Sequence, residues 1–344
     1  MSESDKKLQF PFVRIVGQES MKNALILNII DPKIGGVLLR GEKGTAKSTT
    51  VRSLEQILPN VRSVKGCQFH CNPDNPKDYC SDCREKAENG SMEVEERTMR
   101  VVELPLNATE DRISGSLNIE HILKTGEKKY EGGVLAQANG NILYVDEVNL
   151  LDDHIVDLLL DSAAMGRNYI EREGISYSHP AKFILVGSMN PEEGTLRPQL
   201  MDRFGMCVEV ATERDIPTRV EVIKRRLEFD DNPEKYTEEC AAETEELKKR
   251  IADAKAMLPK IEISESIMNV IAKVSIAYKM EGHRADLAMI RAAKANAAFN
   301  GRTEVTKQDI SAVAALILRH RMKSGPFEES DFHQAELDGI LWGA

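Results

Sequence analysis

The chain has 344 residues and a formal net charge of −10, from 46 basic and 56 acidic side chains. Hydrophobic residues make up 41% and charged residues 30%, which is typical of a globular chain with room for a large and a smaller domain. The acidic balance argues against a broad nucleic-acid-binding surface, and the longest uncharged stretch, 132–145, is too short to span a bilayer. The first ten residues lack the apolar segment of a secretion signal. We therefore expect a cytoplasmic protein with no membrane span that binds no nucleic acid.

The first 215 residues alternate short apolar runs with helical stretches. Apolar runs at 35–41, 141–147 and 182–190 end in glycine, acidic or amide residues, and predict buried parallel strands. Residues 154–166 predict a helix between the second and third strands. In an open α/β sheet, binding groups belong at the carboxyl ends of such strands.

After residue 215 the pattern becomes helical. Helical periodicity covers 243–258, 263–280, 284–300 and 303–322, with Thr306 placed to cap the last helix. We therefore predict an α/β core with a parallel sheet, followed by a small all-helical domain. The predicted division is 1–215 for the core, 216–258 for a helical linker, and 259–344 for the helical domain with its C-terminal tail.

The stretch GEKGTAKST resembles the phosphate-binding pattern G-x-x-x-x-G-K-[ST], with an alanine in place of the last glycine. Gly41 and Gly44 permit backbone angles that turn N–H groups toward an anion, Lys47 supplies a cation for the β- and γ-phosphates, and Ser48 offers a hydroxyl to Mg²⁺. We expect Ala46 to be tolerated, because helical angles suffice at the entrance of the following helix. The alternatives are a chance glycine-rich turn and a decayed site. The residues expected to bind the nucleotide are Gly41, Glu42, Lys43, Gly44, Thr45, Ala46, Lys47, Ser48 and Thr49.

A second motif, ILYVDE, is an apolar strand that ends in two carboxylates, the Walker B arrangement. Asp146 is expected to hold Mg²⁺ together with Ser48, and Glu147 to orient and deprotonate the attacking water. The alternative is a pair of solvated acids at the rim of the sheet. A decayed ATPase would be expected to lose Lys47 or Glu147 first, and both are present. The sequence therefore favours a working ATPase.

Further motifs carry a family resemblance. GSMNP (187–191), LRPQLMDRFG (196–205) and IVGQE (15–19) resemble the AAA+ ATPases. The long stretch 110–160 is more specific, and resembles the ATPase subunit I family of magnesium chelatases, in the clade that also holds MoxR-type ATPases. The similarity runs from about Phe10 to Arg321. It implies an AAA+ P-loop NTPase core followed by a helical lid, and an alanine at the position of Ala46 is familiar among the MoxR relatives.

The resemblance also implies roles for single residues. Asn190 resembles sensor 1, which positions the lytic water, and Arg203 resembles the arginine finger that reaches the neighbouring subunit's γ-phosphate. An ion pair with Asp202 is the structural alternative for Arg203. Arg284 resembles sensor 2, with Arg291 as its rival.

A finger in trans implies a homo-oligomeric ring, expected to be a hexamer. Residues 110–132 would form an insertion around a helix, and residues 166–182 a hairpin before sensor 1. In this clade such insertions face partners or the ring axis.

The function that follows is an ATP-hydrolysing motor that drives Mg²⁺ insertion into protoporphyrin IX through partner subunits. The resemblance implies a von Willebrand factor A-type chelatase subunit and a tetrapyrrole-binding catalytic subunit as partners. The alternatives are the ATPase subunit of a cobaltochelatase, a MoxR-like chaperone for metalloprotein maturation, and a ring component that binds nucleotide without hydrolysing it.

Four of the six cysteines form a cluster in a polar loop at 66–84. Cys67, Cys71, Cys80 and Cys83 have the spacing C-x₃-C-x₈-C-x₂-C, in which two close pairs can converge on one tetrahedral ion. Zn²⁺ as a structural staple is favoured, with an iron–sulfur cluster as the alternative and His70 as a substitute ligand. Free thiols or redox chemistry are the remaining interpretation.

The other candidates are less specific. Cys207 and Cys240 are expected to be ordinary residues, and His121, His154 and His179 to be structural. The tail 324–344, which contains the one tryptophan, Trp342, is expected to pack on the lid, with docking of a partner as the alternative.

Overall fold

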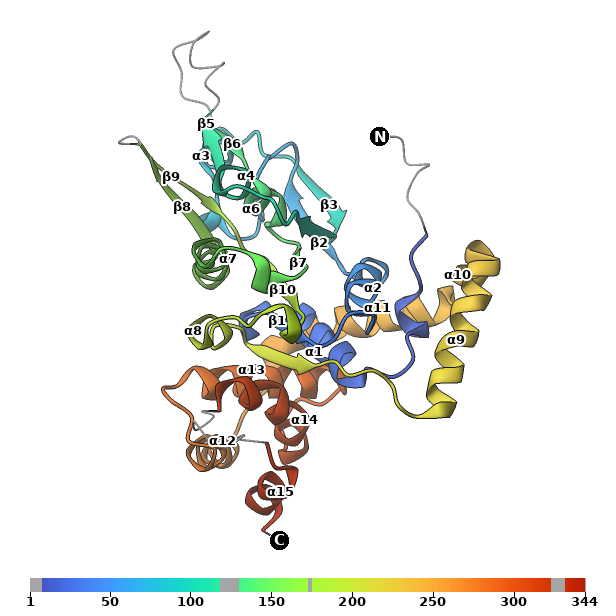
Figure 1. Cartoon of the computed structure of the whole chain (residues 1–344). Helices are drawn as coiled ribbons and strands as arrows, with labels where there is room; N and C mark the ends of the chain where they lie inside the picture. Colours follow the sequence, from blue (N-terminus) through green and yellow to red (C-terminus); the bar gives the residue numbers. More distant parts are fainter. Residues whose placement is uncertain (1–7, 118–129, 173–174, 323–331, 344) are drawn as a thin grey trace. The chain divides into compact units, whose positions relative to one another are not determined.

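The computed structural model describes residues 8–117, 130–172, 175–322 and 332–343 (Figure 1). Its main sheet has five strands in the order β11-β1-β10-β7-β4, and the strand pairs β1–β11, β10–β7 and β4–β7 are parallel. The predicted α/β core with a parallel sheet is therefore confirmed. The apolar runs at 35–41, 141–147 and 182–190 form β1, β7 and β10.

Packing divides the chain into two compact units. Unit 1 comprises residues 1–57 and 189–344, and unit 2 comprises residues 58–188. These units are groups of residues that contact one another more than they contact the rest of the chain. They do not test the predicted division at residues 215 and 258, which stays a prediction. Each unit is described below by itself.

Unit 1 contains strands β1 and β11 with a large set of helices. The elements of unit 1 are η2 (Phe12–Arg14), α1 (Glu19–Ile30), η3 (Pro32–Ile34), β1 (Val37–Arg40), α2 (Lys47–Ser53), η4 (Leu54–Gln56), η7 (Pro191–Glu193), α8 (Pro198–Met201), β11 (Met206–Glu209), α9 (Ile216–Asp231), α10 (Pro233–Glu239), α11 (Ala241–Met257), η8 (Leu258–Lys260), α12 (Glu265–Ala277), α13 (Arg284–Phe299), α14 (Lys307–Leu318), η9 (Arg319–Arg321) and α15 (Gln334–Trp342).

Unit 2 contains the β7 strand with its neighbours and three two-stranded antiparallel pairs. Its elements are β2 (Asn60–Val64), η5 (Pro76–Asp78), α3 (Ser81–Glu88), β3 (Val94–Thr98), β4 (Val101–Leu104), α4 (Glu110–Ser114), β5 (Gly115–Leu117), β6 (Tyr130–Gly132), α6 (Val134–Ala138), β7 (Ile142–Val145), η6 (Val148–Leu150), α7 (Asp153–Met165), β8 (Arg167–Arg172), β9 (Ile175–Pro180) and β10 (Ile184–Met189), whose last residue lies in unit 1.

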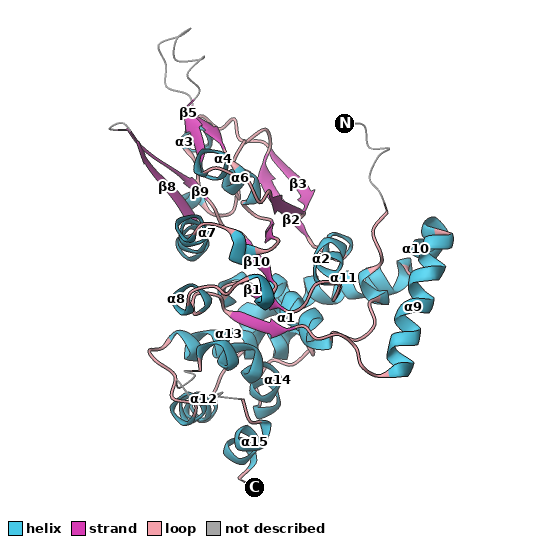
Figure 2. Cartoon of the chain, viewed as in Figure 1, coloured by secondary structure: helices cyan, strands magenta, loops and turns pink. Residues whose placement is uncertain are grey.

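The C-terminal part of unit 1 is all-helical, as predicted (Figure 2). Helix α13 lies at its centre and packs against α11, α12 and α14. It is rich in buried alanines, whose small side chains let neighbouring helices approach closely. The cap expected at Thr306 is a full capping box with Asp309. None of the helices in the described ranges is long and apolar enough to cross a membrane.

The two insertions expected from the resemblance lie in unit 2. Strands β8 (Arg167–Arg172) and β9 (Ile175–Pro180) pair antiparallel within the stretch 166–182 where a hairpin was predicted. At 110–132 the short helix α4 leads into the antiparallel pair β5–β6. The middle of that predicted insertion, 118–129, lies outside the described residues, as does His121.

Candidate functional site

The phosphate loop connects strand β1 to helix α2 in unit 1, as the motif requires. The backbone N–H of Gly41 donates to the carbonyl of Met189 at 3.1 Å. A Cβ atom at Gly41 would lie 2.1 Å from the carbonyl oxygen of Val210, so this glycine is needed for close backbone approach. Gly44 has a positive φ of 85° and open space around it, so here the backbone angle itself favours glycine.

Ala46 does not have the helical angles that we expected. Its φ of 61° and ψ of 15° are left-handed, and it forms the N-cap position of α2. A residue with a Cβ costs about 1–2 kcal/mol in this region, which explains why the common motif has glycine here. The expectation that alanine fits through helical angles is therefore wrong, and the alanine is held at a cost in strain. The carbonyl of Ala46 accepts from the N–H and the hydroxyl of Thr50, both at 2.9 Å.

Lys47 points its ammonium group into the curve of the loop. Its Nζ donates to the carbonyls of Gly41 at 2.7 Å and Glu42 at 2.6 Å, and to the hydroxyl of Thr45 at 3.2 Å. Thr45 is buried, and its hydroxyl donates to the Glu42 carbonyl at 2.8 Å. These three contacts link the Lys47 ammonium group to residues within six positions of it in the chain.

The second motif ends strand β7 in unit 2. The strand is fully buried, and Asp146 follows it directly. The Tyr144 hydroxyl donates to Asp146 Oδ1 at 2.8 Å, and the Ser188 hydroxyl donates to the same oxygen. Two hydroxyl donors thus orient one oxygen of the carboxylate. An oriented carboxylate is the kind of ligand that Mg²⁺ takes in nucleotide sites.

Glu147 has a left-handed backbone, with φ of 52° and ψ of 51°. Its N–H donates to the Ser188 hydroxyl at 3.1 Å. Non-glycine residues with such angles cluster at functional sites, where the surrounding structure holds them in place. Ser188 therefore contacts both acidic residues of the motif. We did not predict it from the sequence, although its position near the end of the GSMN strand was the available signal.

Asn190 follows the end of β10 and belongs to unit 1. The residue is 7% exposed, and its Oδ1 accepts from the N–H of Glu192 at 3.2 Å. This contact caps the short helix η7. A buried amide just after a central strand suits the sensor 1 role, which stays a prediction.

Asp202 is an arginine-binding residue that we considered only as a partner of Arg203. Its carboxylate accepts from Arg284 and, at 3.2 Å, from Nε of Arg321. The second of these arginines is buried, and it also donates to the carbonyls of Asp202, Phe204, Gly205 and Ile317. Burial lowers the pKa of Arg321 to about 10, against the opposing effect of Asp202.

This network joins the segment that carries Arg203 to the helical region. Arg284 begins α13, so its contact with Asp202 places the predicted sensor 2 beside the residue that precedes the predicted finger. Its rival Arg291 donates to the carbonyl of Lys33. The roles of Arg203 and Arg284 stay predictions.

The four clustered cysteines converge in unit 2. All four are buried, and their sulfur atoms lie within 4.8 Å of one another. Hydrogen bonds from Cys71 and Cys80 lower the pKa of Cys67, the contact with Cys67 raises the pKa of Cys71, and burial raises that of Cys83. The crowding thus favours one thiolate at a time unless a cation compensates the charge. Such a group could hold a metal ion, and His70, weighed as a substitute ligand, is not part of it.

Comparison with known proteins gives the family. Residues 88–204 match the family described as AAA domain (dynein-related subfamily), and residues 268–340 match the AAA lid domain. The magnesium-chelatase subunit ChlI homolog of Methanocaldococcus jannaschii is 52% identical over 332 residues, which cover 96% of this chain and 90% of that one. The chain belongs to the magnesium-chelatase ATPase subunit family.

Other relatives agree with this family. The magnesium-chelatase subunit ChlI of Nostoc is 49% identical over 95% of this chain and 88% of its own length. A structure of the complex between subunits BchI and BchD of magnesium chelatase matches with 46% identity and a TM-score of 0.54, covering 94% of this chain and 99% of that one. A putative ATPase from Cytophaga hutchinsonii, at 21% identity and a TM-score of 0.61 over 96% of this chain and 91% of its own, shares the fold.

The remaining candidates of this chelatase subunit, all expected to be structural or packing residues, differ in their burial. His179 is buried, and Nε2 and Nδ1 contact the side chain of Asn168 at 3.1 Å and the carbonyl of Pro180 at 2.9 Å. Cys207 and Cys240 are buried outside the cluster, whereas His154 is exposed. Helix α15 packs through Leu337 and Leu341, while Trp342 is half exposed beneath Lys307.

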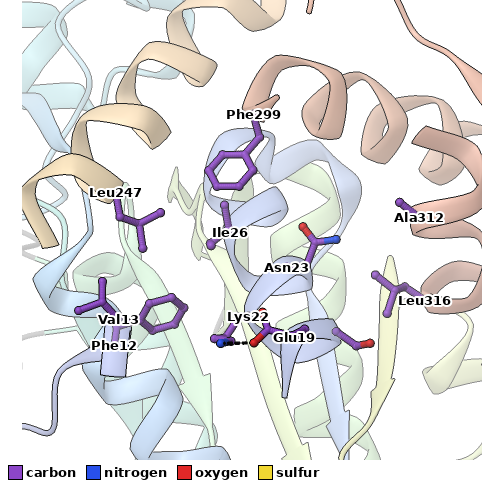
Figure 3. A pocket seen from close by; sticks show the side chains of 11 residues that line it. Phe12, Val13, Glu19, Lys22, Asn23, Ile26, Leu247, Phe299, Ala312 and Leu316 are labelled. Carbon is purple, nitrogen blue, oxygen red and sulfur yellow. Dashed lines mark hydrogen bonds and ion pairs between the residues drawn. The ribbon is translucent and has the colours of Figure 1, made fainter. Parts of the chain in front are cut away.

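A pocket of about 530 Å³ lies in unit 1 of this chelatase subunit, between helices distant from each other in the chain (Figure 3). It is lined by η2, α1, α11, α13 and α14, and the ion pair between Lys22 and Glu19, at 2.6 Å, lies on its wall. None of the residues predicted to bind nucleotide lines it. This pocket is therefore separate from the candidate nucleotide site.

Proposed function

We propose that this chelatase subunit is an ATP-hydrolysing motor that drives Mg²⁺ insertion into protoporphyrin IX through partner subunits. The observation that carries the proposal is the similarity to magnesium-chelatase subunits at about half identity over nearly the whole chain. The proposed cofactors are ATP with Mg²⁺ at the motif residues, and a structural Zn²⁺ at the four cysteines. We also propose a cytoplasmic location.

The residues of the two motifs have the chemistry that ATP and Mg²⁺ require. The loop from Gly41 to Thr49 offers backbone N–H groups and the Lys47 cation to the phosphates. Ser48 and Asp146 supply oxygen ligands of the type that Mg²⁺ prefers. Bound Mg²⁺ neutralises charge on the phosphates during transfer.

The reaction itself needs a base and a cation in the transition state. Glu147 accepts a proton from the attacking water, and its N–H contact with Ser188 fixes the backbone from which the carboxylate projects. Asn190 positions the same water. Arg203 of one subunit stabilises charge at the site of the next, as arginine fingers do in related phosphoryl-transfer enzymes. Arg284 contacts the phosphates from the helical lid.

The proposed assembly is a homo-oligomeric ring, expected to be a hexamer, because a finger in trans needs a neighbour. The matched solved structure is a complex of BchI with BchD, which supports a BchD-like partner for this chain. We propose that this partner is the von Willebrand factor A-type subunit, and that a separate subunit binds the tetrapyrrole.

The test is ATP hydrolysis by the purified chain, with Glu147→Gln as the variant and oligomer size measured in parallel. Removing the base is expected to lower turnover by about 10²–10⁴-fold while nucleotide binding and ring assembly persist. The decisive step adds a BchD-like partner and a tetrapyrrole-binding subunit with protoporphyrin IX and Mg²⁺. Magnesium insertion that requires ATP and fails with Glu147→Gln supports the proposal.

Other outcomes would identify the alternatives. Insertion of Co²⁺ into a corrinoid, with no Mg²⁺ insertion, would indicate a cobaltochelatase subunit. Turnover stimulated by a metalloprotein client alone would indicate a MoxR-like chaperone. Assembled rings that never hydrolyse ATP, with or without partners, would indicate a structural ring component.

A further inference from the structure

The sulfur geometry of the cysteine cluster distinguishes a single metal ion from a multi-iron cluster. Tetrahedral Zn²⁺ with Zn–S bonds of about 2.3 Å places its sulfur ligands about 3.8 Å apart. The sulfur atoms of Cys67 and Cys80 are 3.8 Å apart, and no pair in the group exceeds 4.8 Å. An iron–sulfur cluster interposes several irons and sulfides between its cysteines and needs wider spacing. The arrangement therefore fits a single tetrahedral ion.

The backbone around the cluster also has the form of a thiolate site. Cys67 and Cys71 flank a tight turn after β2 in which His70 takes a positive φ of 46°. The N–H of Cys80 donates to the sulfur of Cys71 at 3.3 Å, a contact that favours thiolate over thiol. Cys80 is the N-cap of α3 and Cys83 lies in its first turn, where the helix dipole favours negative charge.

The segment that carries the cysteines has few other means of folding. Between β2 and β3 its large buried side chains other than cysteine are Phe69 and Tyr79, and the rest is mainly polar. Such a segment buries too little apolar surface to order itself, whereas a structural metal supplies folding free energy directly. A disulfide does not explain the arrangement, since the 3.8 Å between Cys67 and Cys80 is far beyond an S–S bond of about 2.05 Å.

The cysteine cluster packs directly against the β8–β9 hairpin. Ile170 and Tyr177 of the hairpin pack on the same buried cluster as the four cysteines. The Phe69 ring, which lies between two of the cysteines in sequence, stacks on His179 at a centroid distance of 4.9 Å. Tyr177 stacks on Tyr130 at 4.2 Å. Three hairpin side chains thus rest on the surface that the cysteines support.

Hydrogen bonds extend this support to the chain that follows the hairpin. The side-chain amide of Asn139 donates to the carbonyl of Phe69 at 2.7 Å, and its Oδ1 accepts from the N–H of Lys182 at 2.9 Å. Lys182 follows the hairpin, and its ammonium group pairs with Asp78, between the two cysteine pairs. The cysteine segment therefore contacts the hairpin itself and the chain just after it.

We propose that the four cysteines bind one Zn²⁺ and that this ion fastens the β8–β9 hairpin to the core of unit 2. Zinc has no redox chemistry here and acts by joining the two halves of the cysteine segment. With the halves joined, Phe69 and the buried cysteines form a rigid floor for Ile170, Tyr177 and His179. The proposal builds on the zinc cofactor proposed above and does not depend on ATP turnover.

The first experiment measures metal in the full chain. Elemental analysis of the reduced protein is expected to give one zinc per chain. Exchange of the zinc for Co²⁺ is expected to give the visible absorption of a tetrahedral site with four thiolate ligands. Cys83→Ser is expected to lose the zinc, and the matched control Cys240→Ser, at a buried thiol outside the cluster, to keep it. Absence of zinc uptake by the reduced wild type, bound iron instead, or disulfides among these cysteines would overturn the assignment.

The second experiment tests the fastening by hydrogen exchange. Removing zinc from the wild type with a chelator is expected to speed amide exchange in β8 and β9 by at least about tenfold, with α13 and α14 unchanged. This measurement remains valid if Cys83→Ser fails to fold. Zinc binding with no change in the exchange of the hairpin would overturn the fastening role.

A pair of variants separates zinc binding from fastening. Tyr177→Ala removes the stacked ring and is expected to keep zinc while the hairpin exchanges faster. Tyr169→Ala, on the exposed side of the same hairpin, is expected to change neither property. If both variants changed amide exchange in the hairpin equally, the proposed packing of Tyr177 on the cysteine segment would be contradicted. Because neither readout uses ATP, failure here is distinct from failure of the motor function.

Discussion

The phosphate loop and the carboxylate end of β7 carry the two halves of the proposed ATP chemistry, and the chain builds them differently. The ammonium group of Lys47 donates to Gly41, Glu42 and Thr45, all within six residues of it. Asp146 accepts from Tyr144, two residues before it, but also from Ser188, 42 residues further along the chain. The loop is a local structure that a short motif specifies, whereas the orientation of the carboxylate requires a neighbouring strand in the correct register.

The loss of Lys47 from the phosphate loop is expected to lower turnover more than the loss of the Ser188 hydroxyl beside Asp146. Lys47→Ala removes the cation that the loop places for the phosphates, and is expected to lower ATP turnover by about 10²–10³-fold. Lys43→Ala is the matched control, because this neighbouring lysine is exposed in the same loop and is expected to contribute through its backbone. Steady-state hydrolysis measures both variants. Comparable losses would mean that general positive charge, and not the position of Lys47, matters.

The capping box of α14 allows a test of whether interactions between residues close together in the chain also contribute strongly to the free energy of unfolding. Asp309 is fully buried and accepts from Arg302, Thr306 and Asn296, so Asp309→Asn is expected to lower the free energy of unfolding by about 2–3 kcal/mol at pH 7. The exposed acid in the control Asp253→Asn is expected to give almost no change. Urea denaturation measures both, and equal effects would contradict a special role for the box.

The difference in unfolding free energy between wild type and Asp309→Asn is expected to depend on pH in one direction. Burial alone would raise the pKa of Asp309, but the hydrogen bonds from Arg302, Thr306 and Asn296 outweigh it and hold the pKa below its usual range. The stabilisation is therefore complete above the unfolded pKa of about 3.9, and is lost as the pH falls through the lower folded pKa. The gap between wild type and Asp309→Asn should narrow only in that acidic range, and a gap that narrows near neutral pH would contradict this assignment.

Substitution of Ser188 tests whether Asp146 needs a hydrogen bond from the neighbouring strand. Ser188→Ala removes one donor to Asp146 and the acceptor for the Glu147 N–H, and is expected to lower turnover by about tenfold and to raise the Mg²⁺ concentration needed. Tyr144→Phe removes the other donor to the same oxygen. A double-mutant cycle is expected to show coupling between the two hydroxyls. Unchanged turnover and strict additivity would show that the carboxylate is oriented without them.

The smallest effect concerns the strain at Ala46. Ala46→Gly relieves the left-handed backbone, although glycine also gives the unfolded chain more freedom, so the net stabilisation is expected to be about 0.5–1 kcal/mol. Thermal and urea unfolding measure it. The control Ala252→Gly, at an exposed position within α11, is expected to destabilise by about 1 kcal/mol. If Ala46→Gly destabilises as well, the alanine is not strained in the folded protein.

Much of the fold could be predicted from the sequence, because strands and helices with strong apolar patterns can be recognised from a short stretch of residues. The runs that became β1, β7 and β10 are continuous and apolar, and the helices after residue 215 have clear periodicity. We did not predict β2 and β3, which pair with each other and present mainly polar, exposed side chains. Their apolar pattern is too weak to indicate strands without knowledge of the pairing.

By itself, the sequence determined the motif residues, the helix caps and the spacing of the four cysteines, because each depends on residues close together in the chain. The tertiary structure decided the left-handed backbone of Ala46, the contacts of Ser188 with Asp146 and Glu147, and the convergence of four sulfur atoms within 4.8 Å. These features depend on strand register and on how distant segments pack. Since register is set by the whole sheet and not by a single motif, a linear pattern does not specify them.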